Sequence, residues 1–330
     1  MAAVIDVHTH ILAEDTIRLL QKEAPSIGLK LQPLDAESAV LEVAGVPYRP
    51  FPRGGFDNDR RLQDMQSTGI DMQVLSATPQ TYLYNQDASL TAATAALQND
   101  QIAALVAKYP GRFAGIATLP MQAPEAAAAE LRRAMRERGL RGAMIGSNIN
   151  GRNLDDPSLA PFWSAAEELG AFIFIHPVGV AGAERLKSYY LVNLIGNPVD
   201  TTIAAASLIF GGVLERHPRL KICLAHGGGF VPYQGGRWVH GWQVRPEPQQ
   251  ILKRSPEHDL SRFVYDTITH SDASLDFLVK TAGAGRVLLG SDYPYDMGLY
   301  DGVKRVHALA IGEAEKAAVL GGTTAALLGL

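Results

Sequence analysis

Residues 172–177 read Phe-Ile-Phe-Ile-His-Pro, which is four large apolar residues in a row followed by a histidine. An apolar run without alternation is typical of a strand that is buried on both faces, as strands of parallel sheets are. Helical spacing of apolar residues precedes this run over Leu159–Leu169 and follows it over Asp200–Arg216. A buried strand between two helices predicts an α/β fold with a parallel sheet.

Seven further runs of this kind occur along the chain, and helical patterns separate most of them. We expect the eight strands at Val4–Val7, Met72–Ala77, Phe113–Thr118, Gly142–Ile145, Phe172–Ile175, Lys221–Ala225, Phe263–Asp266 and Val287–Gly290. Further helices are expected at Leu90–Lys108, Pro124–Arg138, Ser274–Ala282, Val303–Leu309 and Glu313–Leu320. Eight strands that alternate with helices predict a (β/α)₈ TIM barrel.

Three long stretches interrupt the alternation, and each follows the end of a predicted strand. Residues 13–59 follow the first strand, residues 178–198 the fifth, and residues 227–256 the sixth. Barrel enzymes build their active sites from the loops at this end of the strands. We therefore expect one barrel domain over residues 1–330, with long insertions at the C-terminal rim that form the site or an interface.

The composition excludes several classes of protein. One cysteine among 330 residues cannot form an internal disulfide or a thiolate-rich zinc or iron–sulfur site. The net charge of −4 gives no basic field, so nucleic acid is not favoured as a partner. No targeting segment is visible, and the longest apolar run, over residues 203–214, is too short to span a bilayer. We expect a cytoplasmic protein with no membrane partner.

Five polar side chains end four of the predicted strands or directly follow them. His8 and His10 end the first strand and, being two residues apart, point to the same face. His176 follows the fifth strand, His226 the sixth and Asp292 the eighth. Because the strands of a barrel end at one rim, these five side chains are expected to converge there.

Convergence of this kind favours a metal site. A single buried histidine is usually a core residue that hydrogen-bonds the backbone. For five polar groups at one rim, the same explanation would require a coincidence. Imidazole nitrogen and carboxylate oxygen suit a divalent ion, Zn²⁺ first, with Mn²⁺, Co²⁺ and Fe²⁺ as alternatives. A second ion usually needs a bridging Lys after the fourth strand, where residues 142–148 read Gly-Ala-Met-Ile-Gly-Ser-Asn. The sequence therefore predicts a single ion.

The order of the His and Asp residues after successive strands resembles the pattern of the amidohydrolase superfamily. Within it, the chain is similar nearly end to end to the aminocarboxymuconate-semialdehyde decarboxylase family. The stretches that carry this similarity are Thr-Leu-Pro-Met-Gln-Ala-Pro-Glu at 118–125, Ala-His-Gly-Gly-Gly at 225–229, Gly-Arg-x-x-His-Gly at 236–241, Val-Arg-Pro at 244–246 and Gly-Ser-Asp-Tyr-Pro at 290–294.

The resemblance implies a role for each rim residue. His8, His10, His176 and Asp292 match the family's zinc ligands, and His226 matches the base beside the metal-bound water. Asp292 is also expected to pass protons. The chemistry agrees, since zinc lowers the pKa of bound water to about 7 and a neutral imidazole can take the proton.

Three arginines match residues that the family uses for substrate. Arg49 matches the arginine that binds a substrate carboxylate, and Arg237 and Arg245 lie in the segment after the sixth strand. A planar guanidinium binds a carboxylate through two hydrogen bonds, although an arginine taken at random is more often a solvated surface residue. In the family, one arginine of this segment reaches in from the neighbouring subunit. The resemblance thus implies a homodimer in which residues 227–256 form the contact.

The chain departs from the family in the aromatic wall of the pocket. The family has Trp-Asp directly after His-Pro at the fifth strand, where this chain has Val178-Gly179. Tyr190 and Tyr295 are candidates to line a substrate ring, with core packing as an equally weighted alternative. Asp6 is expected to support a ligand histidine. We expect a substrate that carries a carboxylate but differs from aminocarboxymuconate semialdehyde.

The function implied is a metal-dependent, non-oxidative decarboxylase of an unsaturated or aromatic carboxylic acid. Metal-bound water, deprotonated with help from His226, would promote protonation of the carbon that bears the carboxylate. The main alternative uses the same water as a nucleophile on an amide, lactone or C–C bond, or adds it to a double bond as a hydratase. A more distant alternative is a non-catalytic zinc-stabilised binding protein.

Overall fold

The structure, a computed structural model that describes residues 3–330, is a barrel of eight parallel strands. The strands are β1 (Ile5–Ile11), β5 (Met72–Ala77), β6 (Phe113–Gly115), β7 (Gly142–Gly146), β8 (Phe172–His176), β9 (Lys221–Leu224), β10 (Val264–Asp266) and β11 (Val287–Leu288). They pair in the orders β1–β5–β6 and β7–β8–β9–β10–β11. Single bridges between Thr9 and Tyr293 and between Ala117 and Ala143 join the two groups. The predicted (β/α)₈ barrel is confirmed.

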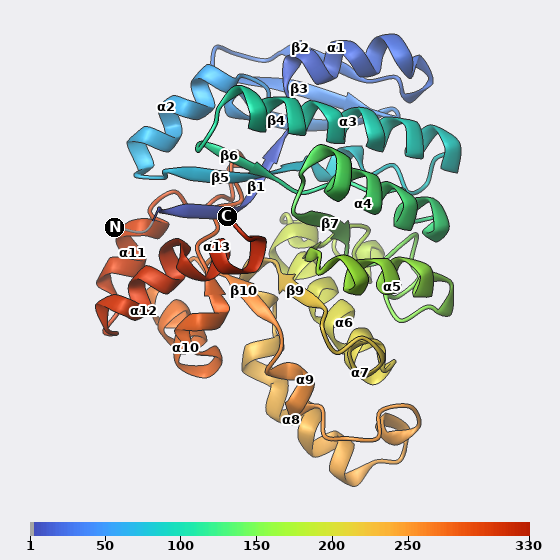
Figure 1. Cartoon of the computed structure of the whole chain (residues 1–330), viewed down its shortest axis with the longest axis vertical. Helices are drawn as coiled ribbons and strands as arrows, with labels where there is room; N and C mark the ends of the chain where they lie inside the picture. The colour runs from blue at the N-terminus through green and yellow to red at the C-terminus, as the bar shows by residue number, and fades with distance from the viewer. Residues whose placement is uncertain (1–2) are drawn as a thin grey trace.

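Helices cover the outside of the barrel (Figure 1). They are α2 (Asn58–Thr68), α3 (Ala88–Lys108), α4 (Pro124–Arg138), α5 (Ala160–Leu169), α6 (Asn197–Phe210), α7 (Val213–Arg216), α10 (Asp272–Ala282), α11 (Gly302–Ala308), α12 (Glu313–Ala317) and α13 (Thr323–Leu328). Local signals set several of their ends. Pro124 opens α4, and Gly139 ends it in the left-handed conformation with φ 69°.

Two predicted helices are interrupted. The helix expected over Asp200–Arg216 is split into α6 and α7, because Gly212 adopts φ +70° between them. The helix expected over Glu313–Leu320 ends as α12 at Ala317 and continues as a wider π-helical turn over Ala318–Gly322. There Gly321 passes so close to the backbone of Ala3 that a β-carbon would lie 2.1 Å from its carbonyl oxygen.

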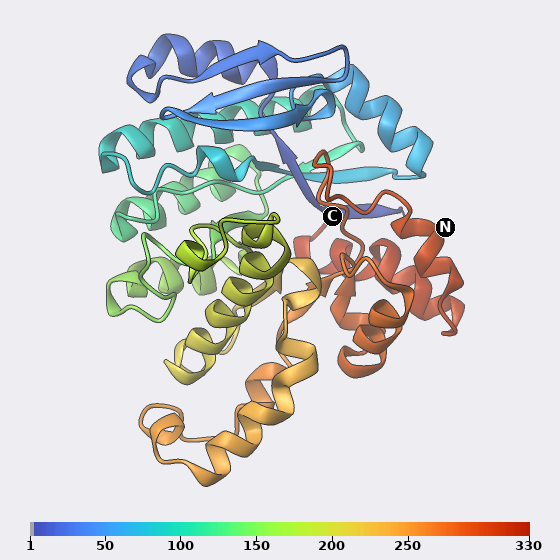
Figure 2. The same ribbon diagram turned by 180° about the vertical axis from the view of Figure 1, so that it is seen from behind.

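The insertion at residues 13–59 forms a small layer of its own on one side of the barrel. It holds α1 (Glu14–Glu23) and an antiparallel sheet of β2 (Lys30–Pro33), β3 (Ser38–Val43) and β4 (Val46–Pro52). Figure 2 shows this sheet beside α1, at the edge of the barrel. Its apolar residues, among them Ile17, Leu41 and Phe51, pack in a separate buried cluster that includes Leu12 at the end of β1 and Tyr295.

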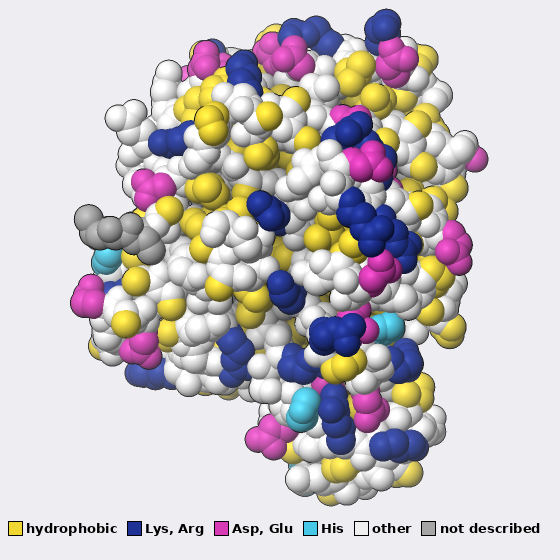
Figure 3. Space-filling model, viewed as in Figure 1, with side chains coloured by type: hydrophobic (Ala, Val, Ile, Leu, Met, Phe, Trp, Pro, Cys, Tyr) yellow, Lys and Arg dark blue, Asp and Glu magenta, His cyan; other side chains and the backbone are white. Residues whose placement is uncertain are grey.

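The stretch after β9 forms an arm that extends away from the barrel. It contains α8 (Val231–Val244) and α9 (Glu257–Leu260), two helices that the sequence pattern does not predict. Figure 3 shows the arm as a lobe below the main body, with basic, acidic and histidine side chains on its surface. Three large apolar side chains of the segment, Tyr233, Val244 and Ile251, are more than half exposed.

The barrel core is continuous from Ile5 to Leu328. Every residue of β8 is buried, as a strand covered on both faces requires. Cys223 is buried within β9. Within residues 3–330, no helix combines the length and the apolar character needed to cross a bilayer.

Candidate metal centre and active site

The strand ends bring all five predicted rim residues together. His8 Nε2 lies 3.1 Å from His10 Nε2, and Asp292 Oδ1 lies 3.3 Å from the first and 3.1 Å from the second. His226 Nε2 lies 3.4 Å from Asp292 Oδ2. Ligand atoms of His8, His176, His226 and Asp292 all lie within 4.8 Å of one another. Nitrogen and oxygen atoms from β1, β8 and the loops after β9 and β11 thus surround one point.

The histidine rings of β1 turn lone pairs toward this point. His8 Nδ1 donates to Asp266 Oδ2 over 2.7 Å, which leaves Nε2 of a neutral ring as a lone pair. His10 Nδ1 lies 3.4 Å from Ser76 Oγ, and this hydroxyl donates its own proton to the Thr9 carbonyl. Two Nε2 lone pairs and a carboxylate oxygen that face one another at 3.1–3.3 Å repel unless a cation lies among them.

The side chain of His176 independently tests whether these residues fit a metal ion. It is buried and its Nδ1 lies 3.1 Å from the Pro177 carbonyl oxygen, yet its Nε2 has no hydrogen-bond partner within residues 3–330. A buried nitrogen without a partner is costly, so an unpaired Nε2 in this position fits a metal ligand. The donor set of imidazole nitrogen and carboxylate oxygen suits a divalent ion.

The electrostatics of the cluster favour neutral rings at His10 and His176, whereas the charge of Asp292 and the hydrogen bond to Asp266 outweigh burial and raise the pKa of His8. Metal binding at His8 would therefore release a proton. Burial lowers the pKa of His10 to about 4 and lowers the pKa of His176 well below its ordinary value. Both rings are therefore neutral at neutral pH, as metal ligands must be. Burial alone would raise the pKa of Asp292, but the His8, His10 and His226 rings around its carboxylate outweigh burial and hold the pKa well below the usual range. Asp292 is thus an anion.

Asp266 organises two members of the cluster at once. Besides the His8 ring, it accepts hydrogen bonds from the backbone N–H groups of His226 at 2.8 Å, Gly227 at 2.7 Å and Ile268 at 3.0 Å. Asp6, which is expected to support a ligand histidine, bonds the backbone of His8 and not its ring. It accepts from the Ser291 hydroxyl and from the backbone N–H groups of Ser291 and His8. Asp266 ends a predicted strand, so the rule that found the other five residues could have found it as well.

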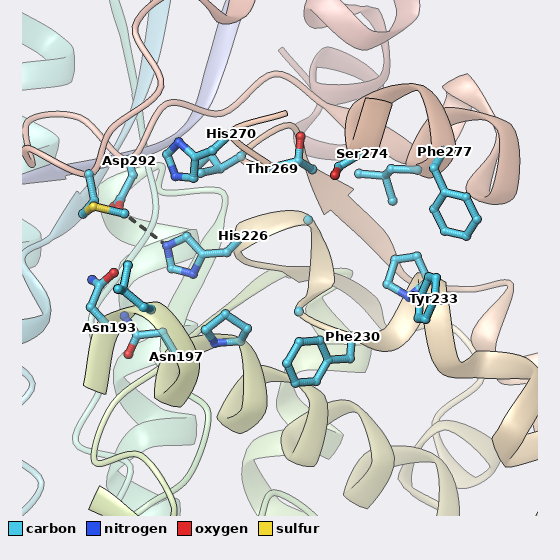
Figure 4. Close-up of a pocket in the computed structure, with 18 of the residues that line it drawn as sticks. Asn193, Asn197, His226, Phe230, Tyr233, Thr269, His270, Ser274, Phe277 and Asp292 are labelled. Atoms are coloured by element: carbon cyan, nitrogen blue, oxygen red, sulfur yellow. Dashed lines mark hydrogen bonds and ion pairs between the residues drawn. The ribbon is translucent and has the colours of Figure 1, made fainter. Parts of the chain in front are cut away.

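An open cavity of about 570 Å³ lies beside the cluster. His226 and Asp292 border it, and Figure 4 shows His226 at its centre with Asp292 close by. The side chains of His8 and His10 are fully buried, whereas 16% of the His226 side chain is exposed. His226 is therefore the histidine placed to meet both the cluster and a substrate.

The two candidate tyrosines take different positions. Tyr295 is buried with its ring centroid 5.2 Å from that of His10, and its hydroxyl bonds Thr78 and Gln80. Tyr190 lies on the rim, 54% exposed, with φ +60°. Tyr295 is thus a wall of the cluster, while Tyr190 faces the solvent in the isolated chain.

The three candidate arginines lie outside the cavity of a single chain. Arg49 is exposed on β4, beside Tyr48, whose ring packs 5.5 Å from that of Tyr295. Arg237 is exposed on α8. Arg245 ends this helix and pairs with Glu247 at 2.5 Å. Their contact with a substrate carboxylate stays a prediction.

A closed barrel that gathers this His/Asp set at its C-terminal rim defines the class of the protein: the chain belongs to the amidohydrolase family, whose model matches residues 5–330. Within the family it groups with 2-amino-3-carboxymuconate-6-semialdehyde decarboxylases. It is 39% identical over 328 residues to the one from Dictyostelium discoideum, which covers 99% of this chain and 91% of that protein.

Solved structures of decarboxylases share the whole fold. The 5-carboxyvanillate decarboxylase from Sphingomonas paucimobilis is 27% identical with a TM-score of 0.86, and the match covers 100% of both chains. A dihydroxybenzoic acid decarboxylase from Polaromonas sp. is 25% identical with a TM-score of 0.82, over 100% of this chain and 98% of that one. The latter structure holds manganese and the inhibitor 2-nitroresorcinol. These comparisons support a divalent metal at the cluster.

Proposed function

We propose that this protein is a metal-dependent, non-oxidative decarboxylase that acts on an unsaturated or aromatic carboxylic acid. The observation that carries the proposal is the convergence of His8, His10, His176 and Asp292 beside an open cavity that His226 borders. The decarboxylases among its relatives support the same reaction class.

The ion is assigned to His8, His10, His176 and Asp292, with Zn²⁺ as the first candidate because three imidazoles and one carboxylate suit it. A divalent ion held there supplies a Lewis acid and lowers the pKa of water at the site. Manganese in the Polaromonas relative makes Mn²⁺ the alternative. Elemental analysis of protein purified without added metal tests this choice, and a predominance of manganese would contradict it.

His226 and Asp292 are assigned the proton transfer. Their side chains lie 3.4 Å apart at the edge of the cavity, so a proton taken up by the imidazole can be held next to the substrate. In the reaction, a proton is added to the carbon that bears the carboxylate and the bond to that carboxylate breaks. The electron pair of this bond stays with the carbon skeleton, and CO₂ leaves. Each turnover consumes one proton and needs neither an oxidant nor a reductant.

Arginines are proposed to hold the substrate acid, with Tyr190 and Tyr295 as walls for its ring. Arg49 would act from its own chain, and Arg237, with Arg245 in a lesser role, from a homodimer partner. Two features support this arrangement: no Lys or Arg lines the cavity within residues 3–330, and the arm that carries Arg237 exposes large apolar side chains. Oligomers that bury such a surface are common. A cytoplasmic location is part of the same proposal and is tested by cell fractionation.

The reaction is tested by incubating metal-loaded protein with a panel of aromatic and muconate-type acids. We expect CO₂ and the decarboxylated product in equal amounts. Incorporation of water without CO₂ would identify the hydrolase or hydratase alternative. A protein that binds its ion in a closed shell and converts none of the acids would be the zinc-stabilised binding protein.

The trans arrangement of Arg237 is tested by mixing two inactive variants, His226→Ala and Arg237→Ala. If Arg237 acts in the partner's site, each mixed dimer contains one complete site, and random mixing of equal amounts restores about a quarter of the wild-type activity. If Arg237 acts in its own chain, mixing restores nothing. Light scattering on the same samples measures the oligomeric state.

A further inference from the structure

Three imidazole or amide side chains line the cavity and have no part in the metal cluster. They are His270, Asn193 and Asn197. Figure 4 shows them on two sides of His226, with His270 on one side and the two asparagines on the other. None of these three side chains forms a hydrogen bond or ion pair with another group of residues 3–330. Their donors and acceptors are thus free for a ligand in the cavity.

The backbone presents His270 to the cavity in a fixed position. His270 follows β10 with φ +54°, next to φ +55° at His226 and +60° at Asp292. This left-handed conformation is uncommon for residues other than glycine, and three of the eight such residues within residues 3–330 border this cavity. The neighbours of His270 are held on both sides: the Thr269 N–H donates to Thr267 O at 2.9 Å, and Ser271 Oγ caps α10. A polar group on such a rigid turn is suited to binding.

The two asparagines come from one helical face. Asn193 lies in the π-helical turn Val192–Gly196, and Asn197 is the first residue of α6. Residues four apart in a helix lie on one side of it, so both amides can face the cavity. Wide turns of this kind are rare and are frequently found at functional sites.

The lining at this end of the cavity suits a neutral group. No Lys or Arg of residues 3–330 lines the cavity, and the ion and the arginines are already assigned to the reacting carboxylate. Phe230, Tyr233 and Phe277 supply apolar walls further out. A hydroxyl or carbonyl oxygen can bond the imidazole and amide groups of this end directly, whereas a second carboxylate would find no charged partner among them.

We propose that His270, Asn193 and Asn197 form a second substrate-binding subsite, which takes an uncharged hydroxyl or carbonyl oxygen while the reacting carboxylate lies at the cluster. The inference rests on the proposed function, because that function defines the acid whose second group is bound. It adds His270 as a substrate-contacting residue and restricts the substrate to acids with a neutral oxygen substituent.

The test measures binding and does not require turnover. Titrations of metal-loaded protein with 2,6-dihydroxybenzoate, 2-hydroxybenzoate and benzoate give the gain in affinity per hydroxyl. We expect wild type to bind 2,6-dihydroxybenzoate roughly tenfold more tightly than benzoate, as one good hydrogen bond allows. In His270→Ala this preference should fall to about twofold or less while benzoate affinity is retained, and His270→Gln, which keeps a donor at similar reach, should restore part of it.

Two results would overturn the subsite. An equal hydroxyl preference in wild type and His270→Ala overturns it, and so does a wild type that binds none of the three acids. His307→Ala, an exposed histidine of α11, is the matched control and should keep the wild-type preference. Equal metal content and equal Tm in all variants exclude a merely structural effect. A wild type that shows the preference but decarboxylates no acid would refute the proposed function and leave the subsite standing.

Discussion

At the scale of single residues, His226 is distinguished from the other histidines of the cluster by its partial exposure at the cavity. We expect His226→Ala to lower kcat by about 10²–10⁴-fold, because general acid–base catalysis contributes that much. Metal content should stay at the wild-type level, since four other groups remain as ligands. His307→Ala should keep full activity. Loss of the metal from His226→Ala would instead make His226 a ligand.

Asp266 acts on the metal site without facing the cavity. Burial raises the pKa of Asp266, but the hydrogen bonds from the His8 ring and from the Gly227 backbone N–H counter this, so the pKa lies below its ordinary value and the group is an anion. In Asp266→Asn the amide presents a donor or a weaker acceptor to the His8 ring. We expect metal affinity to fall about 10–100-fold, as for other groups that orient a ligand histidine.

Metal titration against a competing chelator measures this loss. Asp276→Asn is a suitable control, because Asp276 pairs with Lys280 on the surface of α10 and is far less buried. An unchanged metal affinity in Asp266→Asn would mean that packing alone positions the His8 ring.

At the scale of elements, α2 is tied to β1, β5 and the loop after β11 by a fully buried arginine. Arg61 donates to the His10 carbonyl and to Gln73 Oε1, and its guanidinium lies 4.7 Å from the centroid of the Tyr293 ring. Arg61→Ala leaves buried acceptors without donors and should cost about 3 kcal/mol in free energy of unfolding. Because His10 and Asp292 lie next to these contacts, we expect activity to fall as well.

Urea unfolding of Arg61→Ala and Arg60→Ala separates the buried contact from a surface charge. Arg60 directly precedes Arg61 in α2 and pairs with Glu37 and Asp64 at the surface. Surface ion pairs contribute about 0–1 kcal/mol, so Arg60→Ala should be nearly neutral. Equal losses in the two variants would refute the role given to Arg61.

At the scale of the whole molecule, the ion should stabilise the barrel because β1, β8 and the loops after β9 and β11 all contribute to its site. A ligand that binds only the folded state stabilises it by about 4 kcal/mol at a thousandfold excess over Kd. We expect chelation to lower Tm and abolish turnover, and Zn²⁺ to restore both. A Tm that does not respond to chelator would contradict metal binding at this cluster.

We also expect the chain to unfold in one cooperative transition, as a single domain over residues 1–330. The main core contains residues from Ile5 to Leu328, so neither half of the barrel can retain its packing alone. Differential scanning calorimetry of the metal-loaded protein measures this directly. A separate early transition would mean that the insertion at residues 13–59, with its own buried cluster, unfolds independently.

The sequence by itself determined the barrel and the composition of the metal cluster. Buried strands and amphipathic helices are local patterns, and the ends of parallel strands meet at one rim, so residues at strand ends could be grouped before any contact was known. Local patterns failed where packing overrides them. The proline-rich insertion hides β2, β3 and β4, and two glycines, Gly235 and Gly236, obscure the helical character of α8.

Only the tertiary structure decided how the rim residues are used. Spacing along a strand sets the direction in which a side chain points. The residue that it meets there comes from another strand, which closure of the barrel brings alongside. The His8 ring is thus held by Asp266, 258 residues away, and not by the nearby Asp6. Closure also buries His10 and leaves His226 at the cavity, and it places His270 opposite Asn193 and Asn197. These contacts join segments far apart in the chain, so no local pattern can encode them.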